Sequence, residues 1–280
     1  MKSGWAKIKQ YLPDKSVLDE KPPFDNDLSQ SLFHQGNQIG CITLHGIGGT
    51  PANIRVVADA LIDEGYTVLS PTLPGHGETV RALNASTGEQ WVQCVLDAYD
   101  QLIAYGCTQI YALGLSLGGV LSALLAETHP LSGLVLICAP IEMQPYLHFA
   151  RRISHILPFI RYAEKEGHPK SWHSDPYAQM YDGFSTSKLR DLNRLCKQLR
   201  KSLSLITCPT LMVTAKYDDK VAPCSIDIYK NRATQVPSIE FLHLENSAHG
   251  CTYGPEKALV AERAAIFVRR MVDNSTPPPL

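Results

Sequence analysis

The sequence predicts an α/β protein with a mostly parallel central sheet, helices on both faces and an inserted helical cap. The first observation is that short apolar runs, typical of buried strands, alternate with longer runs of helical character. The second is that this alternation stops at about Pro140 and resumes after Leu205. Alternation of strands and helices builds a parallel sheet, because each crossover between parallel strands needs a connection that packs on one face.

Six apolar runs are expected to form the sheet. They are short, and turn-forming residues separate them from the helical segments, as in sheets that are buried on both faces. The predicted strands are residues 40–44, 66–70, 109–113, 133–138, 210–215 and 239–244. The predicted helices are residues 51–65, 88–105, 120–127, 225–232 and 255–272.

Two threonines are expected to cap helices. Thr50 precedes Pro51, so its hydroxyl can cap the first helix while the proline fits the first turn. Thr87 precedes residues 88–105, whose apolar positions follow the helical period. Both sites predict where a helix begins after a loop.

On this pattern the chain divides into a core with additions. Residues 1–35 form an N-terminal leader, residues 36–140 and 206–272 an α/β core, residues 141–205 a cap insertion, and residues 273–280 a flexible tail. A chain of 280 residues is long enough for one large domain of this kind.

The composition excludes several classes of function. The 26 Lys and Arg nearly balance the 27 Asp and Glu, so no nucleic-acid partner is expected. No apolar run approaches the roughly 18 residues of a membrane span. The eight cysteines contain no Cys-x-x-Cys pair, which predicts small core residues and neither a metal site nor a disulfide framework. The chain start has no secretory signal, so a cytoplasmic location is expected.

The leader leaves contact with a membrane surface open. Trp5, Ile8, Tyr11 and Leu12 fall on one helical face between lysines, a pattern that suits a lipid surface. The same face can instead pack on the rest of the protein or fray. The residues alone leave the oligomeric state undetermined.

A serine lies between two glycines where a predicted strand meets a predicted helix, in the run Tyr111-Ala-Leu-Gly-Leu-Ser-Leu-Gly-Gly119. This is the sequence form of a nucleophile elbow, a tight turn that exposes the serine Oγ above the sheet edge. Gly114 and Gly118 let strand and helix pack closely around that turn. A serine hydroxyl is a weak nucleophile without a base, so Ser116 predicts a histidine nearby.

The partners of such a serine are expected at the ends of later strands. Asp218 follows the predicted strand 210–215, and His249 follows the strand 239–244. Position after the last strand distinguishes His249 from the other nine histidines, of which His243 lies inside that strand. Asp219 is an alternative acid, because adjacent loop residues point in different directions.

Backbone amides are expected to stabilise the oxyanion that a serine attack creates. The run His45-Gly-Ile-Gly-Gly49 follows the first core strand, and the amides of Ile47 and Leu117 are the predicted oxyanion hole. A phosphate-binding loop is not expected, because no Lys-Ser or Lys-Thr pair follows these glycines. The run Pro74-Gly-His-Gly77 is expected to be a turn, with contact of His76 to substrate as the alternative.

With these residues in place, the chain resembles the α/β-hydrolase superfamily, and within it the cap-bearing bacterial carboxylesterases close to monoacylglycerol lipases. The similarity runs over roughly residues 35–272. The matching segments are 44–50, 75–77, 113–119, 138–140, 215–218 with Pro223, and 247–249. The resemblance implies that Ser116 is acylated, that Asp218 orients His249, and that the Ile47 and Leu117 amides bind the oxyanion.

The resemblance implies a serine carboxylesterase that needs no cofactor or metal and acts on esters with short to medium acyl chains, monoacylglycerols included. Acyl thioesters or amides are alternative substrates for the same three side chains. A hydrolase-fold protein that binds a ligand without turnover is the alternative from another class. Six apolar cap residues suit an acyl chain or simply bury the cap: Leu147, Phe149, Ile153, Leu157, Phe159 and Ile160.

Overall fold

A seven-stranded sheet lies at the centre of the structure, a computed structural model that describes residues 18–19, 27–152, 154, 159–161, 175–181 and 183–275. The strand order is β1-β3-β2-β4-β5-β8-β9, and every neighbouring pair is parallel except β1 with β3. The strands are β1 Leu32–His34, β2 Ile39–Leu44, β3 Thr67–Ser70, β4 Gln109–Leu115, β5 Gly133–Ile137, β8 Thr210–Tyr217 and β9 Ile239–Ala248. All six predicted strands are present.

The strand order creates a switch point. The chain passes from β2 outward to β3 and then crosses to β4 on the other side of β2. In open parallel sheets, ligands bind beyond the carboxyl ends of the strands where the order reverses. The loops after β2 and β4 therefore meet at the place where a site is expected.

The predicted leader, residues 1–35, contains the first strand of the sheet, so its boundary at residue 35 is wrong. Leu32–His34 pairs antiparallel with β3 and forms an edge of the sheet. A three-residue edge strand carries too few residues to show a period, so its pairing partner defines it. The leader residues 1–17 lie outside the described part of the chain, including Trp5, Ile8, Tyr11 and Leu12.

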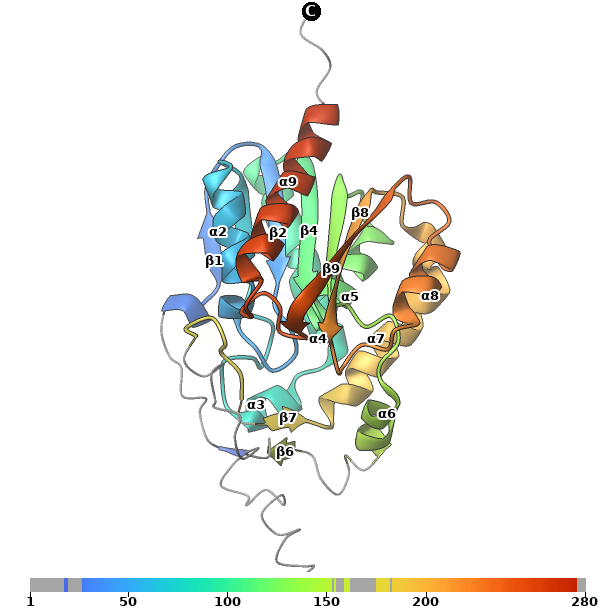
Figure 1. Cartoon of the computed structure of the whole chain (residues 1–280). Helices are drawn as coiled ribbons and strands as arrows, with labels where there is room; N and C mark the ends of the chain where they lie inside the picture. Colours follow the sequence, from blue (N-terminus) through green and yellow to red (C-terminus); the bar gives the residue numbers. More distant parts are fainter. Residues whose placement is uncertain are drawn as a thin grey trace, which may run out of the picture.

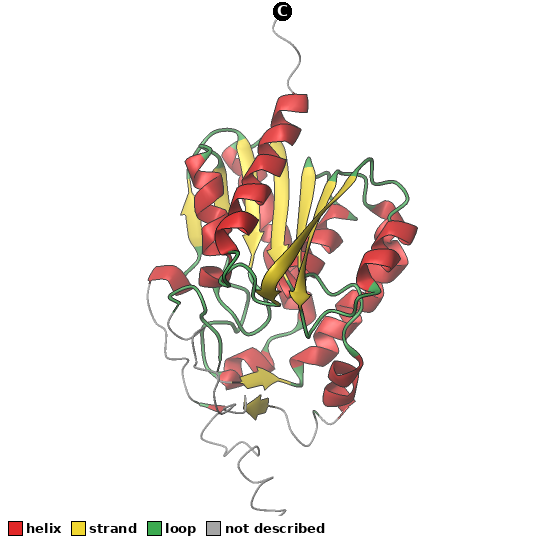
Figure 2. Cartoon of the chain, viewed as in Figure 1, coloured by secondary structure: helices red, strands yellow, loops and turns green. Residues whose placement is uncertain are grey.

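Helices cover both faces of the sheet, which confirms the predicted fold class (Figures 1 and 2). Helices α2 (Arg55–Asp63) and α9 (Lys257–Ser275) pack together over one face. Helices α4 (Gly88–Tyr105), α5 (Leu117–Ala126) and α8 (Ser225–Arg232) contribute to the core on the other face. Helix α9 extends into the predicted tail, whose start at residue 273 is therefore wrong.

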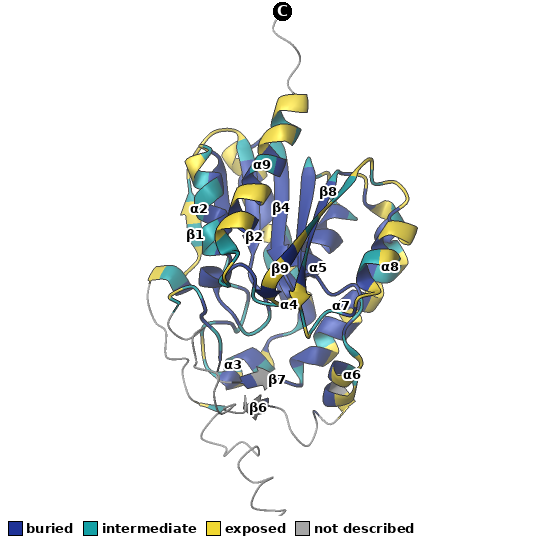
Figure 3. Cartoon of the chain, in the orientation of Figure 1, coloured by how far each residue is buried: buried dark blue, intermediate teal, exposed yellow. Residues whose placement is uncertain are grey.

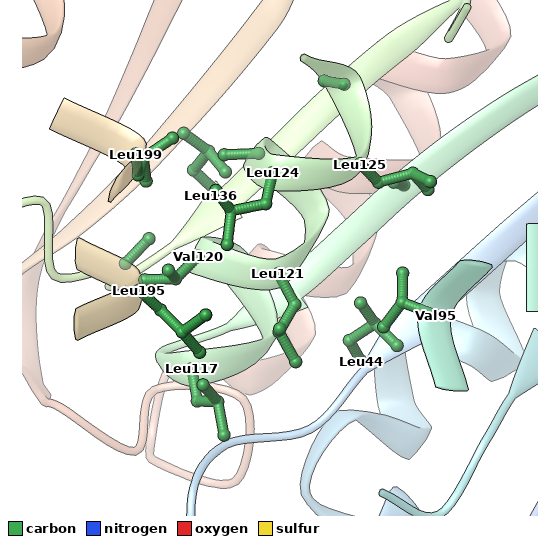
Figure 4. Close-up of a cluster of buried hydrophobic side chains, with 14 of the residues drawn as sticks. Leu44, Val95, Leu117, Val120, Leu121, Leu124, Leu125, Leu136, Leu195 and Leu199 are labelled. Carbon is green, nitrogen blue, oxygen red and sulfur yellow. The ribbon is translucent and has the colours of Figure 1, made fainter. Parts of the chain in front are cut away.

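Helix α5 is buried along its whole length. Each of its ten residues is buried, and Figure 4 shows Leu117, Leu121 and Leu124 packed among side chains from the sheet and from neighbouring helices. A helix that is apolar on all sides belongs in the interior. Its first turn is therefore held rigidly at the end of β4.

The two predicted caps have different outcomes. Thr87 forms a capping box with Gln90 at the start of α4, as predicted. Thr50 precedes a short 3-10 helix, η3 (Pro51–Ile54), but its hydroxyl caps nothing and donates to Gln179 Oε1 at 2.8 Å. A partner 129 residues away has replaced the local hydrogen bond.

The described part of residues 141–205 lies beyond the carboxyl ends of the strands, beside α3 (Val80–Ala85) (Figure 1). It contains helices α6 (Pro145–Arg152) and α7 (Lys188–Ser202), a short 3-10 helix η5 (Leu203–Leu205) and a two-stranded pair, β6 (Phe159–Arg161) with β7 (Gly183–Ser185). Helix α7 packs on α5 and α6. Figure 3 shows the central strands of the sheet as the most buried layer, with exposed residues on the outer helices and on the edge strand β9. No helix among the described residues has the length and apolar character to cross a bilayer.

Candidate active site

The turn between β4 and α5 holds Ser116 in a strained backbone conformation. Its φ is 55° and its ψ is −115°, a region that residues with a side chain rarely adopt. Only glycine fits on either side: a Cβ at Gly114 would lie 2.1 Å from the Gly118 carbonyl carbon, and one at Gly118 would lie 2.1 Å from the Leu44 oxygen. This packing turns the chain so sharply that Ser116 stands at the sheet edge, as in a nucleophile elbow.

The structure brings Ser116, His249 and Asp218 into one hydrogen-bonded line. His249 Nε2 lies 2.8 Å from Ser116 Oγ, and His249 Nδ1 lies 2.9 and 3.0 Å from the two carboxylate oxygens of Asp218. Asp218 directly follows β8 and His249 directly follows β9, so neighbouring parallel strands deliver both side chains to the end of the sheet. Asp219 instead turns away and pairs with Lys220 Nζ at 3.0 Å.

Asp218 is held in its ionised form. Burial raises the pKa of this carboxyl, but the hydrogen bond and charge of His249 together with two backbone donors outweigh burial and hold the pKa below its ordinary value. The donors are the N–H groups of Lys220 and Val221, at 2.8 and 3.0 Å from Oδ1. An ionised Asp218 keeps the imidazole proton on Nδ1, which leaves Nε2 free to accept the proton of Ser116.

The loop after β2 lies against the serine. A Cβ added at Gly46 would be only 3.4 Å from Ser116 Cβ. The amides of Ile47 and Leu117 hydrogen-bond to no acceptor in the described part of the chain, and Leu117 is the first residue of α5. Amides at a helix start carry partial positive charge and attract anions. The pair is therefore available to an oxyanion beside Ser116.

Asn53 connects the loop after β2, which carries Ile47, to the segment 175–181 by hydrogen bonds. This contact was not predicted from the sequence. The buried side chain of Asn53 donates from Nδ2 to the carbonyls of Tyr177 at 2.7 Å and Gln179 at 3.1 Å. The Asn53 carbonyl accepts from Thr252, three residues after His249. One residue thus joins the Ile47 loop, the cap and the His249 loop. No local pattern could have revealed it, because the partners lie more than 100 residues away.

A pocket opens beside Ser116 and His249. Asn53, Ser185 and Lys220 add polar groups to a mainly apolar lining. The apolar side chains are those of Ile47, Leu83, Leu115, Pro140, Met143, Leu147, Met180, Leu189, Leu192 and Tyr253. An apolar pocket with a few polar groups is typical of sites for small, partly apolar molecules.

The six apolar cap residues that were expected beside an acyl chain differ in whether they line the pocket. Leu147 lines the pocket, whereas Phe149 is 64% exposed. Phe159 does not line the pocket itself but is buried in a small cluster with Val80 and Leu83, and Leu83 lines the pocket. Ile153 and Leu157 lie outside the described residues, and Ile160 belongs to β6.

Two buried histidines support the loops without lining the pocket. His45 Nδ1 donates to the Gly46 oxygen at 2.9 Å, and His45 Nε2 accepts from the Leu73 amide at 3.1 Å. Burial lowers the pKa of His45 to about 4 and that of His76 to about 3. His76 packs between the rings of His45 and Trp91. In this structure His76 is a packing residue, so the alternative role in substrate contact gains no support.

The cysteines are mostly core residues, as expected. Six of the eight are buried, Cys94 is partly buried and Cys224 is exposed. The expectation of a core role is therefore wrong for Cys224, which directly precedes α8.

Comparisons with known proteins agree with this architecture. A thermostable monoacylglycerol lipase of Bacillus sp. (strain H-257) is 31% identical over 85% of this chain and 94% of its own length. A carboxylesterase of Bacillus subtilis (strain 168) is 28% identical over 85% of this chain and 95% of its own length. A solved structure from work on two metagenome-derived lipolytic enzymes has a TM-score of 0.77 and 27% identity, covering 87% of this chain and 98% of that chain.

The model of the alpha/beta hydrolase family matches residues 41–263. That span contains the β4–α5 turn with Ser116 and the loops after β8 and β9 that carry Asp218 and His249. Because the match covers most of the sheet and all three loops, the chain belongs to the alpha/beta hydrolase family.

Proposed function

We propose that the chain is a carboxylic ester hydrolase that works through an acyl-enzyme on Ser116. The observation that carries the proposal is the line of hydrogen bonds from Ser116 through His249 to Asp218, beside an apolar pocket. A base within 2.8 Å of the hydroxyl and an ionised acid behind it are the groups that serine attack requires. The two relatives named as a monoacylglycerol lipase and a carboxylesterase support an ester as the substrate.

In the first half-reaction, His249 Nε2 takes the proton of Ser116 as Oγ bonds to the ester carbonyl carbon. The carbonyl oxygen becomes an oxyanion, which accepts hydrogen bonds from the Ile47 and Leu117 amides. Each such donor is worth about 3 to 4 kcal/mol of transition-state stabilisation. The bond to the leaving oxygen then breaks, and His249 gives its proton to that oxygen to release the alcohol.

In the second half-reaction, water replaces the alcohol. His249 takes a proton from the water as its oxygen attacks the acyl carbon, and the same amides hold the new oxyanion. The bond to Ser116 Oγ breaks, and His249 returns the proton to it while the acid leaves. Asp218 stays ionised throughout and stabilises the imidazolium that forms twice in each cycle.

The pocket supports an uncharged, short to medium acyl group, with monoacylglycerols in the substrate class. Side chains such as Leu83, Leu189 and Leu192 offer apolar contact to a hydrocarbon chain. A carboxylate at the far end of an acyl group would lose hydration against these side chains, which disfavours charged substrates.

The test is intact-protein mass after exposure to a fluorophosphonate, alongside hydrolysis of p-nitrophenyl esters of graded acyl length. We expect one covalent adduct on Ser116, turnover of the esters, and an optimum in chain length set by the pocket. Ser116→Ala should lose the adduct and nearly all turnover while its circular dichroism spectrum stays unchanged. Full turnover in a clean Ser116→Ala preparation would refute the mechanism.

Two other outcomes would redirect the function. Faster turnover of acyl-CoA or anilide substrates than of matched esters would favour a thioesterase or an amidase with the same three side chains. A folded protein with neither adduct nor turnover would favour a ligand-binding protein that uses the pocket without chemistry.

A further inference from the structure

Three side chains of the types that can bind metal ions meet beside His249. The Cys138 sulfur, a carboxylate oxygen of Asp218 and a ring nitrogen of His249 all lie within 4.8 Å of one another. His249 turns Nδ1 toward Asp218 and Nε2 toward Ser116. The Cys138 thiol therefore borders the Asp218 and His249 pair, and the serine lies on the opposite side of the imidazole.

Cys138 is held there by its backbone. It directly follows β5 with a φ of 45°, and its amide donates to the Val213 oxygen at 2.9 Å. A positive φ is uncommon for a residue with a side chain and persists only where the surroundings fix it. The backbone that carries the sulfur is therefore fixed at the end of β5, and a metal ligand needs such a rigid support.

A second thiol lies next to the Cys138 sulfur. The sulfurs of Cys138 and Cys251 are 3.7 Å apart, and both residues are buried. Two sulfurs at about 2.3 Å from a tetrahedral zinc ion are separated by about 3.8 Å. The two thiols thus already have the spacing of a bidentate pair, and Cys251 lies two residues from His249.

We propose that Cys138, Cys251, Asp218 and His249 form a binding site for a thiophilic divalent cation such as Cd²⁺ or Zn²⁺, and that occupancy stops catalysis. Thiolate, imidazole and carboxylate are the ligand types that zinc takes in proteins. The inhibitory effect rests on the proposed function of Ser116, whereas the binding itself does not.

Binding changes protons in a defined way. Cys138 and Cys251 bind a cation as thiolates, so each thiol loses its proton to solvent when the cation binds. The cation takes the lone pair of His249 Nδ1, and the single proton of the neutral ring then resides on Nε2. A protonated Nε2 cannot accept the proton of Ser116, so the base of the reaction is lost.

The inference is tested by titrating the purified full-length protein with Cd²⁺ under reducing agent-free, anaerobic conditions. Ultraviolet absorbance of the cadmium–thiolate bond reports binding, and native mass spectrometry reports the number of ions per chain. The variants are Cys138→Ala, Cys138→Ser and Cys251→Ala, with Cys224→Ser as the control for an exposed thiol outside the cluster. Circular dichroism shows whether each variant is folded.

We expect a thiolate band in the wild type and in Cys224→Ser. Loss of Cys138 should weaken this binding by about 100-fold or more, because even the loss of a group behind a metal ligand costs about 10- to 100-fold. Cys251→Ala should weaken the band and halve its thiolate content. Absence of the band in folded wild-type protein, or cadmium binding as tight as that of the wild type in folded Cys138→Ala or Cys138→Ser, would overturn the site.

Two further readouts separate this inference from the proposed function. In the wild type, Cd²⁺ should block both ester turnover and fluorophosphonate labelling of Ser116, and a chelator should restore both. Cadmium binding without any ester turnover in the metal-free protein would refute the proposed function alone. Turnover and labelling that continue with the thiolate band saturated would refute the inhibitory role alone.

Discussion

Two adjacent aspartates follow β8, and their surroundings give them different tasks. Asp218 is mostly buried, accepts two backbone N–H groups and faces His249. The Asp219 side chain is 66% exposed and pairs with Lys220. An exposed ion pair contributes at most about 1 kcal/mol to stability, whereas a buried carboxylate behind a catalytic base controls its tautomer.

Exchange of each carboxylate for an amide should therefore separate the two residues. We expect Asp218→Asn to lower kcat by about 10⁴-fold, because the amide favours the wrong tautomer of His249, with a much smaller change in KM. Asp219→Asn should keep kcat within about twofold. Steady-state hydrolysis of one p-nitrophenyl ester measures both variants. Equal losses in the two variants would mean that neither carboxylate has a specific role.

Site residues could be predicted from the sequence only where their position after a predicted strand also places them in space. Ser116, Asp218 and His249 were predicted because each follows a strand, and parallel strands bring their ends together. The choice between Asp218 and Asp219 depended on resemblance, since neighbouring residues on a loop differ only in direction. The catalytic roles of Ser116 and Asp218 remain predictions that the variants above test.

At the scale of elements, Thr50 and Thr87 present the same local signal with different results. Each stands just before a helix, but only Thr87 accepts a hydrogen bond from the helix it precedes. Thr50 has a distant partner in Gln179, and tertiary contact overrides local preference. For the same reason, the short strands β1, β6 and β7 were not predicted. Each has only three residues, which are too few to show an alternating pattern of apolar and polar residues, and each is stabilised by pairing with another strand.

The hydrogen bonds of Asn53 lead to a prediction about the loop that carries Ile47. Asn53→Ala removes both bonds to segment 175–181, so the loop should lose its fixed distance from Ser116. We expect kcat to fall by about 10-fold or more with little change in KM, since a misplaced oxyanion donor acts mainly on the transition state. Ester kinetics well below the unfolding temperature provide the measurement.

Thr87→Ala is the matched control for this variant. Loss of the capping box should cost about 0.5 to 2 kcal/mol of stability without any change in the oxyanion loop. We therefore expect a lower melting temperature with unchanged kcat. If Asn53→Ala lowers the melting temperature by the same amount but leaves kcat intact, Asn53 has a structural role alone.

For the whole molecule, three buried or partly buried groups make stability depend on pH in opposite directions. The pKa values of His45 and His76 fall from 6.5 to about 4 and about 3, mainly through burial. The pKa of Glu127 rises from 4.5 to about 7, again through burial, although a hydrogen bond from Ser202 opposes the rise. Asp218, lowered from 3.8, affects stability only at lower pH.

The sign follows from which state binds more protons. Between about pH 5 and pH 6, the unfolded chain protonates both histidines while the folded chain leaves them neutral, so the free energy of unfolding rises with pH. Each histidine contributes up to about 1.4 kcal/mol per pH unit. Glu127 is protonated in the folded state and ionised in the unfolded state, so it opposes this slope. Its share is smaller because the side chain is partly exposed and screened by solvent.

These terms predict that the free energy of unfolding, measured by urea titration, rises as pH increases from about 5 to about 6. His76→Phe keeps an aromatic ring between His45 and Trp91 but cannot be protonated, so it should reduce the slope by about 1.4 kcal/mol per pH unit. Glu127→Gln should steepen the slope, because the opposing group is gone. A slope that neither variant changes would mean that these side chains bind protons equally in the folded and unfolded states, and their burial would not control stability in acid.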